Sequence, residues 1–223
     1  QLRKAALFPQ TSSEVDRFGD YERNGDGMHD RLFLMTFDSA ANATPDNTDW
    51  IAEYLRKANL SGTFFVLGKD LQARLNERSV ASLQSTWSTQ CIGVQGWEFR
   101  SHSHWQDWQD SVRRSVELAK SKLPENFVPL FRPPDGQRRA DAVAFFKAQG
   151  LQVALWDIDA QDGAGKLKAN QSAQRVLSLM LLWRHGVINF NVKQDALKTA
   201  MPWLITQTAQ SGIGWEDCQD AFR

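Results

Sequence analysis

The chain has 223 residues, with 26 basic and 26 acidic side chains and a formal net charge of zero. Balanced charge leaves no field that would attract nucleic acid or an anionic membrane surface, so neither is an expected partner. The length suits one domain with a short appendage, and the longest apolar run, residues 176–183, is too short to span a bilayer.

Residues 1–21 show no periodicity, and the next nine residues resemble the head of an EF-hand-like calcium loop. Oxygen-bearing side chains recur at every second position, with Gly27 at the sixth. The candidate calcium ligands are Glu22, Asn24, Asp26, the Met28 carbonyl and Asp30. Because Phe33 occupies the twelfth position, the bidentate glutamate is missing and the site should be weak. The alternative is a tight Asn-Gly and Asp-Gly turn that leads into the next strand.

The apolar run over residues 31–37 predicts a buried strand, and it ends in the carboxylate of Asp38. A charge at the tip of a buried strand is costly unless another group pairs with it or uses it. The carboxyl ends of parallel strands are where α/β proteins build their sites. The alternative is that Asp38 caps the helix that begins near Pro45.

From Asp38 onward the chain alternates between strand-like and helix-like segments, which predicts a parallel sheet, open or closed into a barrel. Helical spacing of apolar residues predicts helices over 46–58, 71–87, 108–123, 140–149, 172–183 and 196–208. Short apolar runs predict strands over 62–67, 92–99, 127–131, 151–156 and 187–190.

Polar residues follow these strands, and in a parallel sheet they would converge at one edge. The candidates are Asp38, His102, His104, Arg132, Asp162 and Asn191. An arginine can hold a carboxylate ionised, and a neutral imidazole can bind zinc, so this set indicates proton transfer with or without a metal. Taken singly, the histidines could be solvated loop residues, Arg132 could satisfy turn carbonyls, and the aspartates could be turn formers.

Several of these segments together resemble the polysaccharide deacetylase (NodB-homology) family of carbohydrate esterases. The similar segments are Thr36-Phe-Asp38-Ser39, Gly62-Thr-Phe-Phe-Val66, His102-Ser-His-Trp-Gln106, Arg132-Pro-Pro-Asp-Gly136 and the stretch 156–162, with Gly186-Val-Ile-Asn-Phe-Asn191 in the place of the last motif. The resemblance covers residues 31–208. It implies an α/β fold, an irregular (β/α) barrel of parallel strands with fewer than eight strands, preceded by an extension over residues 1–30.

The resemblance implies a role for each matching residue. Asp38 would be the general base, Arg132 would orient it, and Asp162 would orient the acid, whose position is held by Asn191. His102 matches a metal ligand, whereas Ser39 and Gln106 replace the other two ligands, and His104 is the remaining imidazole near them. Gly163 and Asn189 replace residues that line the acetyl pocket, and Trp105, Pro133 and Asn189 are the expected substrate-binding residues. Trp97, Trp105 and Trp108 could stack on sugar rings, or belong to the core.

These replacements leave three hypotheses. The first is a divergent hydrolase that removes N-acetyl or O-acetyl groups from a glycan, with Asp38 as base held by Arg132. The second is a catalytically silent domain that binds glycan or scaffolds a partner, and the third is a hydrolase of a small amide. Since a serine and a primary amide are poor zinc ligands, we expect no stoichiometric zinc-type metal at this site unless His104 contributes.

The expected location is secreted, periplasmic or attached to the cell envelope, because the family processes glycans and the chain starts with Gln rather than Met. The two cysteines, Cys91 and Cys218, fit no metal spacing. They are either buried thiols or one disulfide, and the sequence leaves both possibilities open.

Overall fold

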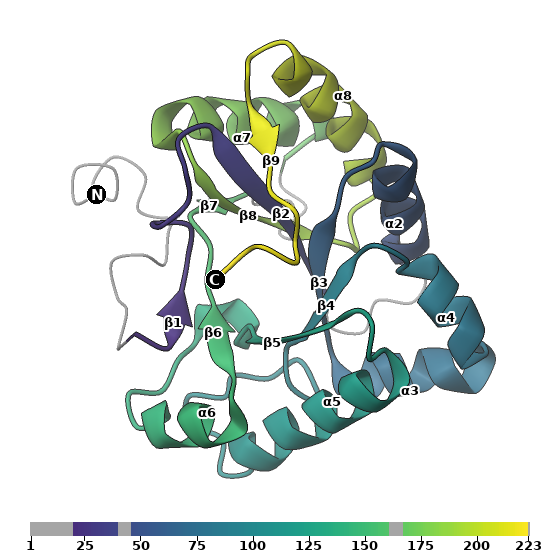
Figure 1. Cartoon of the computed structure of the whole chain (residues 1–223), viewed down its shortest axis with the longest axis vertical. Helices are drawn as coiled ribbons and strands as arrows, with labels where there is room; N and C mark the ends of the chain where they lie inside the picture. Colours follow the sequence, from purple (N-terminus) through teal and green to yellow (C-terminus); the bar gives the residue numbers. More distant parts are fainter. Residues whose placement is uncertain (1–19, 40–45, 161–166, 223) are drawn as a thin grey trace.

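The computed structural model describes residues 20–39, 46–160 and 167–222 (Figure 1). Within these ranges nine strands form one parallel sheet in the order β1-β6-β5-β4-β3-β2-β8-β7, with β9 beside β2. The strands are β1 (Glu22–Arg23), β2 (Leu32–Asp38), β3 (Gly62–Val66), β4 (Cys91–Val94), β5 (Phe127–Phe131), β6 (Gln152–Ala154), β7 (Ile158–Asp159), β8 (Gly186–Asn191) and β9 (Gly214–Trp215). The sheet curls into an open barrel, which confirms the expected fold class.

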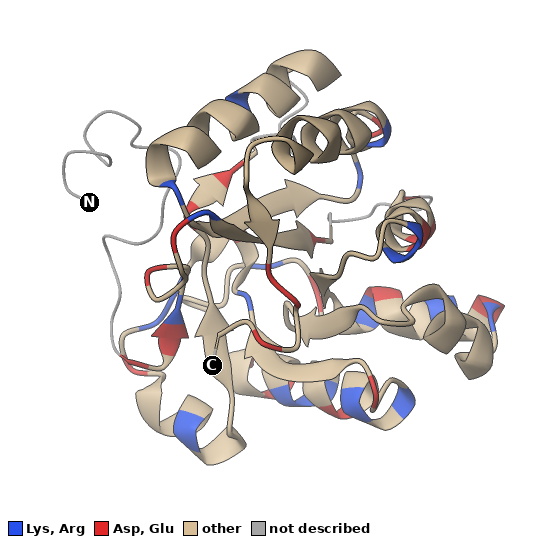
Figure 2. Cartoon of the chain, turned by 45° about the horizontal axis from the view of Figure 1, so that its top comes forward, with Lys and Arg blue, Asp and Glu red and all other residues tan. Residues whose placement is uncertain are grey.

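Helices surround the outside of this barrel (Figure 1). They are α2 (Thr48–Lys57), α3 (Gly68–Glu77), α4 (Val80–Thr86), α5 (Trp108–Lys122), α6 (Val143–Gln149), α7 (Ala169–Trp183), α8 (Leu197–Ala209) and the short 3₁₀ turn η2 (Pro134–Gly136). Both signs of charge are interspersed along α2, α3 and α5, whereas α7 and α8 carry few charges (Figure 2). None of the described helices is long and apolar enough to cross a membrane.

The helices expected over 140–149 and 172–183 each begin three residues away from the expected start, and three predicted elements differ more strongly from the structure. The helix expected over 71–87 is two helices, because the chain is extended at Arg78 and Ser79, and the Ser79 hydroxyl accepts the Ser82 N–H at 3.1 Å. The strand expected over 92–99 ends at Val94, and the strand expected over 151–156 is shorter and is followed by β7. The count of nine strands exceeds the expected number because β1, β7 and β9 have two residues each, too few to show a periodicity.

The short strand β1 lies inside the segment expected to be an N-terminal extension. It pairs in parallel with β6, with Glu22 opposite Val153 and Arg23 opposite Ala154. Residues 22–23 are therefore part of the barrel sheet rather than a separate appendage.

Strand β2 carries its side chains alternately outward and inward. Phe33, Met35 and Phe37 pack in the large core cluster with residues of the surrounding helices. Leu34 instead packs with Val187 inside the barrel. Because successive side chains of a strand point to opposite faces, Thr36 and Asp38 follow Leu34 on the inward face. This alternation directs the carboxylate of Asp38 into the barrel mouth.

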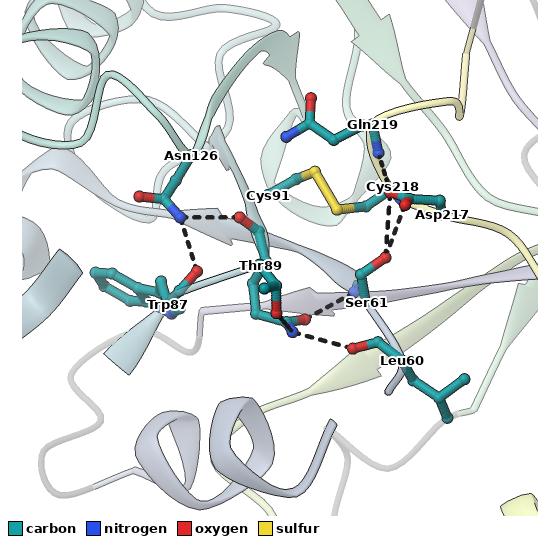
Figure 3. The surroundings of a disulfide bond; sticks show 11 residues. Leu60, Ser61, Trp87, Thr89, Cys91, Asn126, Asp217, Cys218 and Gln219 are labelled. Carbon is teal, nitrogen blue, oxygen red and sulfur yellow. Dashed lines mark hydrogen bonds between the residues drawn. A yellow bond between two sulfur atoms is a disulfide. The ribbon is translucent and has the colours of Figure 1, made fainter. Parts of the chain in front are cut away.

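A disulfide between Cys91 and Cys218 fastens the C-terminal segment to the start of β4 (Figure 3). The two Cα atoms are 6.0 Å apart, and both residues are buried. The Cys218 N–H donates to the Ser61 hydroxyl at 2.9 Å, and the Gln219 N–H donates to Asp217 Oδ1 at 2.9 Å. Of the two possibilities that the sequence left open, buried thiols or one disulfide, the structure shows the disulfide.

Candidate functional site

Arg132 follows β5 directly, and its side chain is fully buried. Its Nε donates to the Ala154 carbonyl at 3.0 Å, and Nη2 donates to the Leu155 carbonyl at 3.1 Å. The guanidinium carbon lies 4.1 Å from the ring centroid of Phe65 and 5.3 Å from that of Trp156. Two carbonyls and two aromatic rings thus fix the guanidinium plane, which leaves Nη1 directed toward β2.

The third nitrogen, Arg132 Nη1, donates to Asp38 Oδ1 at 3.0 Å and to the Thr36 hydroxyl at 2.6 Å. Thr36 in turn donates to the Ile188 carbonyl at 2.7 Å, so its oxygen is free to accept from the arginine. The Asp38 side chain is 14% exposed. Burial raises the pKa of the Asp38 carboxyl, and Arg132 opposes that rise. The structure therefore brings the two residues together as an ion pair with a fully buried guanidinium and a largely buried carboxylate, and the pKa of that carboxyl is above its ordinary value.

Strand β8 supplies two amides next to this pair. In the register of β2 and β8, Asn189 lies opposite Thr36 and Asn191 lies opposite Asp38. Asn189 Oδ1 accepts from Arg132 Nη1 at 3.4 Å, and Asn191 Oδ1 accepts the Lys193 N–H at 2.9 Å. An amide can hold an oxyanion but has no proton to give to a leaving group.

His102 lies eight residues beyond the end of β4 and is 2% exposed. Its Nδ1 is 2.7 Å from the Arg100 carbonyl, and its Nε2 is 2.8 Å from the Ser111 hydroxyl. A carbonyl only accepts, so Nδ1 carries the proton and Nε2 accepts from Ser111. The Ser111 oxygen in turn accepts the Trp97 N–H at 2.7 Å. Burial lowers the pKa of His102 to about 4, so the ring is neutral and both nitrogens have partners at neutral pH.

The structure separates the other predicted residues near His102. Ser39 is half-buried beside Asp38, whereas His104 and Gln106 are exposed. Trp105 is half-buried, with the Arg100 guanidinium 4.5 Å above its ring. Pro133 is buried. Asp162 and Gly163 lie outside the described residues.

Asp157, which lies between β6 and β7, has a structural role. It is 2% exposed, and its Oδ2 accepts the backbone N–H of Gly25 at 2.8 Å and of Val187 at 2.7 Å. A Cβ on Gly186 would lie 2.7 Å from this oxygen, so a glycine is required there. Asp157 therefore ties the N-terminal turn to the start of β8.

Three of the candidate calcium ligands have partners within the protein. Glu22 is buried, and its Oε2 lies 3.3 Å from Arg138 Nη1. Asn24 Oδ1 accepts the Asp26 N–H at 3.0 Å, as in an Asx turn. Asp30 forms a two-point ion pair with Arg184, with one contact of 2.8 Å. These contacts match the tight-turn alternative.

Comparison with known proteins places the chain in a family. A family model described as polysaccharide deacetylase matches residues 25–154, more than half of the chain. The chain belongs to the polysaccharide deacetylase family. No curated protein sequence matches it.

Solved structures of polysaccharide deacetylases share its fold. The Bc1960 peptidoglycan N-acetylglucosamine deacetylase is 18% identical with a TM-score of 0.75, covering 89% of this chain and 91% of that one. PdaC, a peptidoglycan deacetylase from Bacillus subtilis, is 21% identical with a TM-score of 0.65, covering 84% and 87%. BA3943, a CE4 family pseudoenzyme from Bacillus anthracis, is 16% identical with a TM-score of 0.72, covering 86% of this chain and 65% of that one. The chain thus spans about two thirds of the pseudoenzyme's length.

The residues at the family's predicted metal positions do not fit a zinc-type ion. A catalytic zinc takes about three protein ligands from imidazole, thiolate or carboxylate groups. Here Ser39 and Gln106 are neutral oxygen or amide groups, and a metal at His102 would have to displace one of its two hydrogen bonds. Across residues 20–39, 46–160 and 167–222, no three His, Cys, Asp or Glu side chains are gathered as a metal site.

Two residues of the barrel mouth were missed by the sequence argument. Thr36 looks like an ordinary strand residue, yet it shares Arg132 Nη1 with Asp38. The signal in the sequence was a polar side chain at an inward-facing position of an otherwise apolar strand, which indicates a hydrogen-bond partner inside the barrel. Gln95 follows β4 and is 1% exposed, although no charge or motif marks it.

Proposed function

We propose that this member of the polysaccharide deacetylase family is a glycan-binding domain that does not carry out metal-dependent deacetylation. The observation that supports this most is His102, whose two ring nitrogens are both hydrogen-bonded within the protein. Ser39 and Gln106 add no strong ligand, so these residues do not suit the binding of a metal ion that would activate a water molecule.

The barrel mouth still offers polar groups suited to a sugar. Asp38, Asn189 and Asn191 present carboxylate and amide groups at the ends of β2 and β8. Carboxylates accept from sugar hydroxyls, and amides both donate and accept. The named structural neighbours Bc1960 and PdaC are peptidoglycan deacetylases, which supports a glycan as the ligand.

Calorimetry with tetra-N-acetylchitotetraose tests this proposal. We expect saturable binding, no release of acetate, and weaker binding by Asn191→Ala, which removes an amide at the barrel mouth. Asn76→Ala is the matched control, because Asn76 is exposed on α3. Metal-dependent acetate release by the unmodified protein, or no binding of the tetramer at all, would overturn the proposal.

The ion pair favours a second candidate, hydrolysis of an acyl ester on a glycan. Asp38 is held by Arg132 at 3.0 Å, and burial raises its pKa, as suits a general base. The Asp38 carboxylate would take a proton from water as the water oxygen bonds to the ester carbonyl carbon, and Asn191 would hydrogen-bond the oxyanion. The oxyanion would then collapse and break the acyl C–O bond, and the departing sugar oxygen would take the proton back from Asp38. An alkoxide leaves far more readily than the anion of an amine, which must be protonated before it can depart, so an O-acetyl group fits a site without a strong acid.

Acetate release from an O-acetylated xylo-oligosaccharide distinguishes this candidate from a silent domain. If Asp38 is a base, the unmodified protein releases acetate and Asp38→Asn does not. Equal rates for the two proteins, after subtraction of spontaneous hydrolysis, would exclude the second candidate.

We also propose that the protein works outside the cytosol, in the periplasm, cell envelope or external medium. The disulfide between Cys91 and Cys218 supports this, since disulfides persist in oxidising compartments. Fractionation of the source cells, with thiol labelling of each fraction, checks the location. A reduced pool confined to the cytosol would contradict it.

A further inference from the structure

Arg23, the last residue of β1, is a half-buried arginine whose guanidinium has no partner. Its Nε is buried and forms no hydrogen bond. Nη1 and Nη2 also form no hydrogen bond or ion pair among the described residues, but unlike Nε they retain accessible surface. A charged group that loses part of its hydration without gaining an acceptor carries an uncompensated cost, and such groups are uncommon in folded proteins. The guanidinium is therefore suited to an acceptor supplied by a ligand.

The register of β1 and β6 directs this side chain into the barrel. Arg23 lies opposite Ala154, which packs with Phe65 in an interior cluster. The preceding residue of β6, Val153, belongs instead to the core cluster shared with the outer helices. Laterally paired residues of parallel strands point to the same face of a sheet, so Arg23 shares the inward face of Ala154.

Arg23 lies at the same end of the sheet as the ion pair of Arg132 and Asp38. Because the strands are parallel, the last residues of β1, β2 and β8 line one rim, and these are Arg23, Asp38 and Asn191. The Arg23 carbonyl accepts the Leu155 N–H at 2.7 Å, and the Leu155 carbonyl accepts Arg132 Nη2 at 3.1 Å. The two arginines therefore lie on either side of β6. Arg132 is balanced by Asp38 at 3.0 Å, whereas no described carboxylate pairs with Arg23.

The barrel is open beside Arg23. Strand β1 begins the sheet order and β7 ends it, and no hydrogen-bonded ladder joins these two strands within the described ranges (Figure 1). The inward direction of Arg23, its place at the rim and the accessible surface of its Nη atoms agree. Together they put the guanidinium where a ligand in the barrel mouth would meet it.

Neighbouring residues show that the lack of a partner is specific to this position. Glu22, which precedes Arg23, points to the outer face and forms an ion pair with Arg138 at 3.3 Å. Arg175 on α7 has the same partial burial and a buried Nε without a hydrogen bond, but it belongs to a helix outside the barrel. Arg175 is therefore a control that matches Arg23 in burial and differs from it in place.

We propose that Arg23 binds a carboxylate carried by the glycan, so that the barrel mouth selects an anionic polysaccharide. A guanidinium presents its N–H groups as a planar fork that matches the two oxygens of a carboxylate. A sugar hydroxyl brings no negative charge and leaves the cation unbalanced. The carboxylate can belong to a uronic acid or to the lactyl ether of a muramic acid, since both present the same two oxygens. This assignment rests on the proposed glycan-binding function and names the charge class of the ligand.

Calorimetry with two matched tetramers tests the assignment. They are the β-linked tetramer of glucuronic acid and cellotetraose, which has a hydroxymethyl group in place of each carboxylate. The unmodified protein should prefer the glucuronic acid tetramer. Arg23→Met should bind that tetramer about ten- to a hundredfold more weakly, through the loss of charged hydrogen bonds, and should bind cellotetraose unchanged. Arg23→Lys should fall between the two proteins, because it keeps the charge without the fork.

Two further comparisons identify the source of the carboxylate and the role of charge. The disaccharide of N-acetylglucosamine and N-acetylmuramic acid, measured beside di-N-acetylchitobiose, tests the lactyl carboxylate in the same way. A preference that depends on Arg23 in either pair supports the assignment and names the source, and its absence in both pairs overturns it. Added salt should weaken the preferred anionic ligand in the unmodified protein more than in Arg23→Met. Arg175→Met should retain every preference of the unmodified protein.

Thermal unfolding without ligand distinguishes a binding role from a structural one. Arg23→Met keeps an apolar stem and removes a buried Nε that has no partner, so its Tm should not fall below that of the unmodified protein. A lowered Tm would show that the guanidinium has partners within the protein and would overturn the assignment.

The outcomes separate this inference from the proposed function. If the unmodified protein binds tetra-N-acetylchitotetraose but does not distinguish either anionic ligand from its neutral counterpart, the assignment of Arg23 fails and the proposed function survives. If Arg23→Met weakens the anionic and neutral ligands equally, selection of a carboxylate is wrong. If the unmodified protein binds none of these oligosaccharides, the proposed function and this assignment fail together.

Discussion

Acidification should destabilise the fold through His102. The ring is buried and neutral, and its pKa is lowered from 6.5 to about 4 by burial. Between these values the unfolded chain binds a proton that the folded chain does not, so this contribution to stability is complete above pH 6.5 and is lost as the pH falls toward 4. At about 1.36 kcal/mol per unit of pKa shift, acidification through this interval should lower the free energy of unfolding by about 3 kcal/mol.

Urea unfolding at a series of pH values from neutral to acidic measures this loss, with His102→Gln as the reference. Glutamine can donate and accept but does not titrate, so the difference between the two slopes isolates the imidazole. The raised pKa of Asp38 acts in the opposite direction, because its contribution to stability is complete below the ordinary pKa of a carboxyl and is lost as the pH rises. This contribution is the same in the unmodified protein and in His102→Gln, so it cancels in the comparison. Parallel slopes, or an imidazole resonance that titrates near its ordinary pKa, would refute the reasoning.

Three further predictions concern stability, each measured by urea unfolding at neutral pH. Arg132→Met should cost about 3–5 kcal/mol because it strands a buried carboxylate, and the cost should shrink in acid as Asp38 protonates; a loss independent of pH would contradict this. Reducing the Cys91–Cys218 disulfide, which closes a sequence separation of 127, should cost about 4–5 kcal/mol, and an unchanged midpoint in reductant would count against it. Gly186→Ala should cost about 2–4 kcal/mol, since its φ is 141° and a Cβ would meet Asp157, whereas exposed Gly27→Ala, with open space around it, should be nearly neutral.

The alternation of strands and helices predicted the parallel sheet, and the resemblance to the family predicted the barrel and the pairing of Asp38 with Arg132. Alternating strands and helices imply parallel strands, and parallel strands bring their polar ends to one edge. The sequence did not predict the surroundings of His102, because its partner Ser111 lies nine residues away on α5 and meets the ring only through packing. Gln95 was missed for a related reason, because no motif records that a buried side-chain amide has no hydrogen-bond partner among the described residues.

The N-terminal loop shows what the spacing of residues alone leaves open. Oxygen-bearing residues at alternate positions match a calcium loop, but β1 pairs with β6 and turns Glu22 toward Arg138. The same long-range pairing explains why a two-residue strand was placed in an extension rather than in the barrel. The disulfide was undecided for a similar reason, since only the docking of β9 beside β2 brings Cys218 to Cys91.

Metal analysis of the purified protein tests the central claim most directly. The protein is incubated with excess zinc, dialysed, and analysed for bound metal beside His102→Ala. With both nitrogens of His102 hydrogen-bonded and with Ser39 and Gln106 in the other two positions, the account predicts no stoichiometric zinc in either protein. One tightly held zinc per chain that is lost in His102→Ala would contradict it.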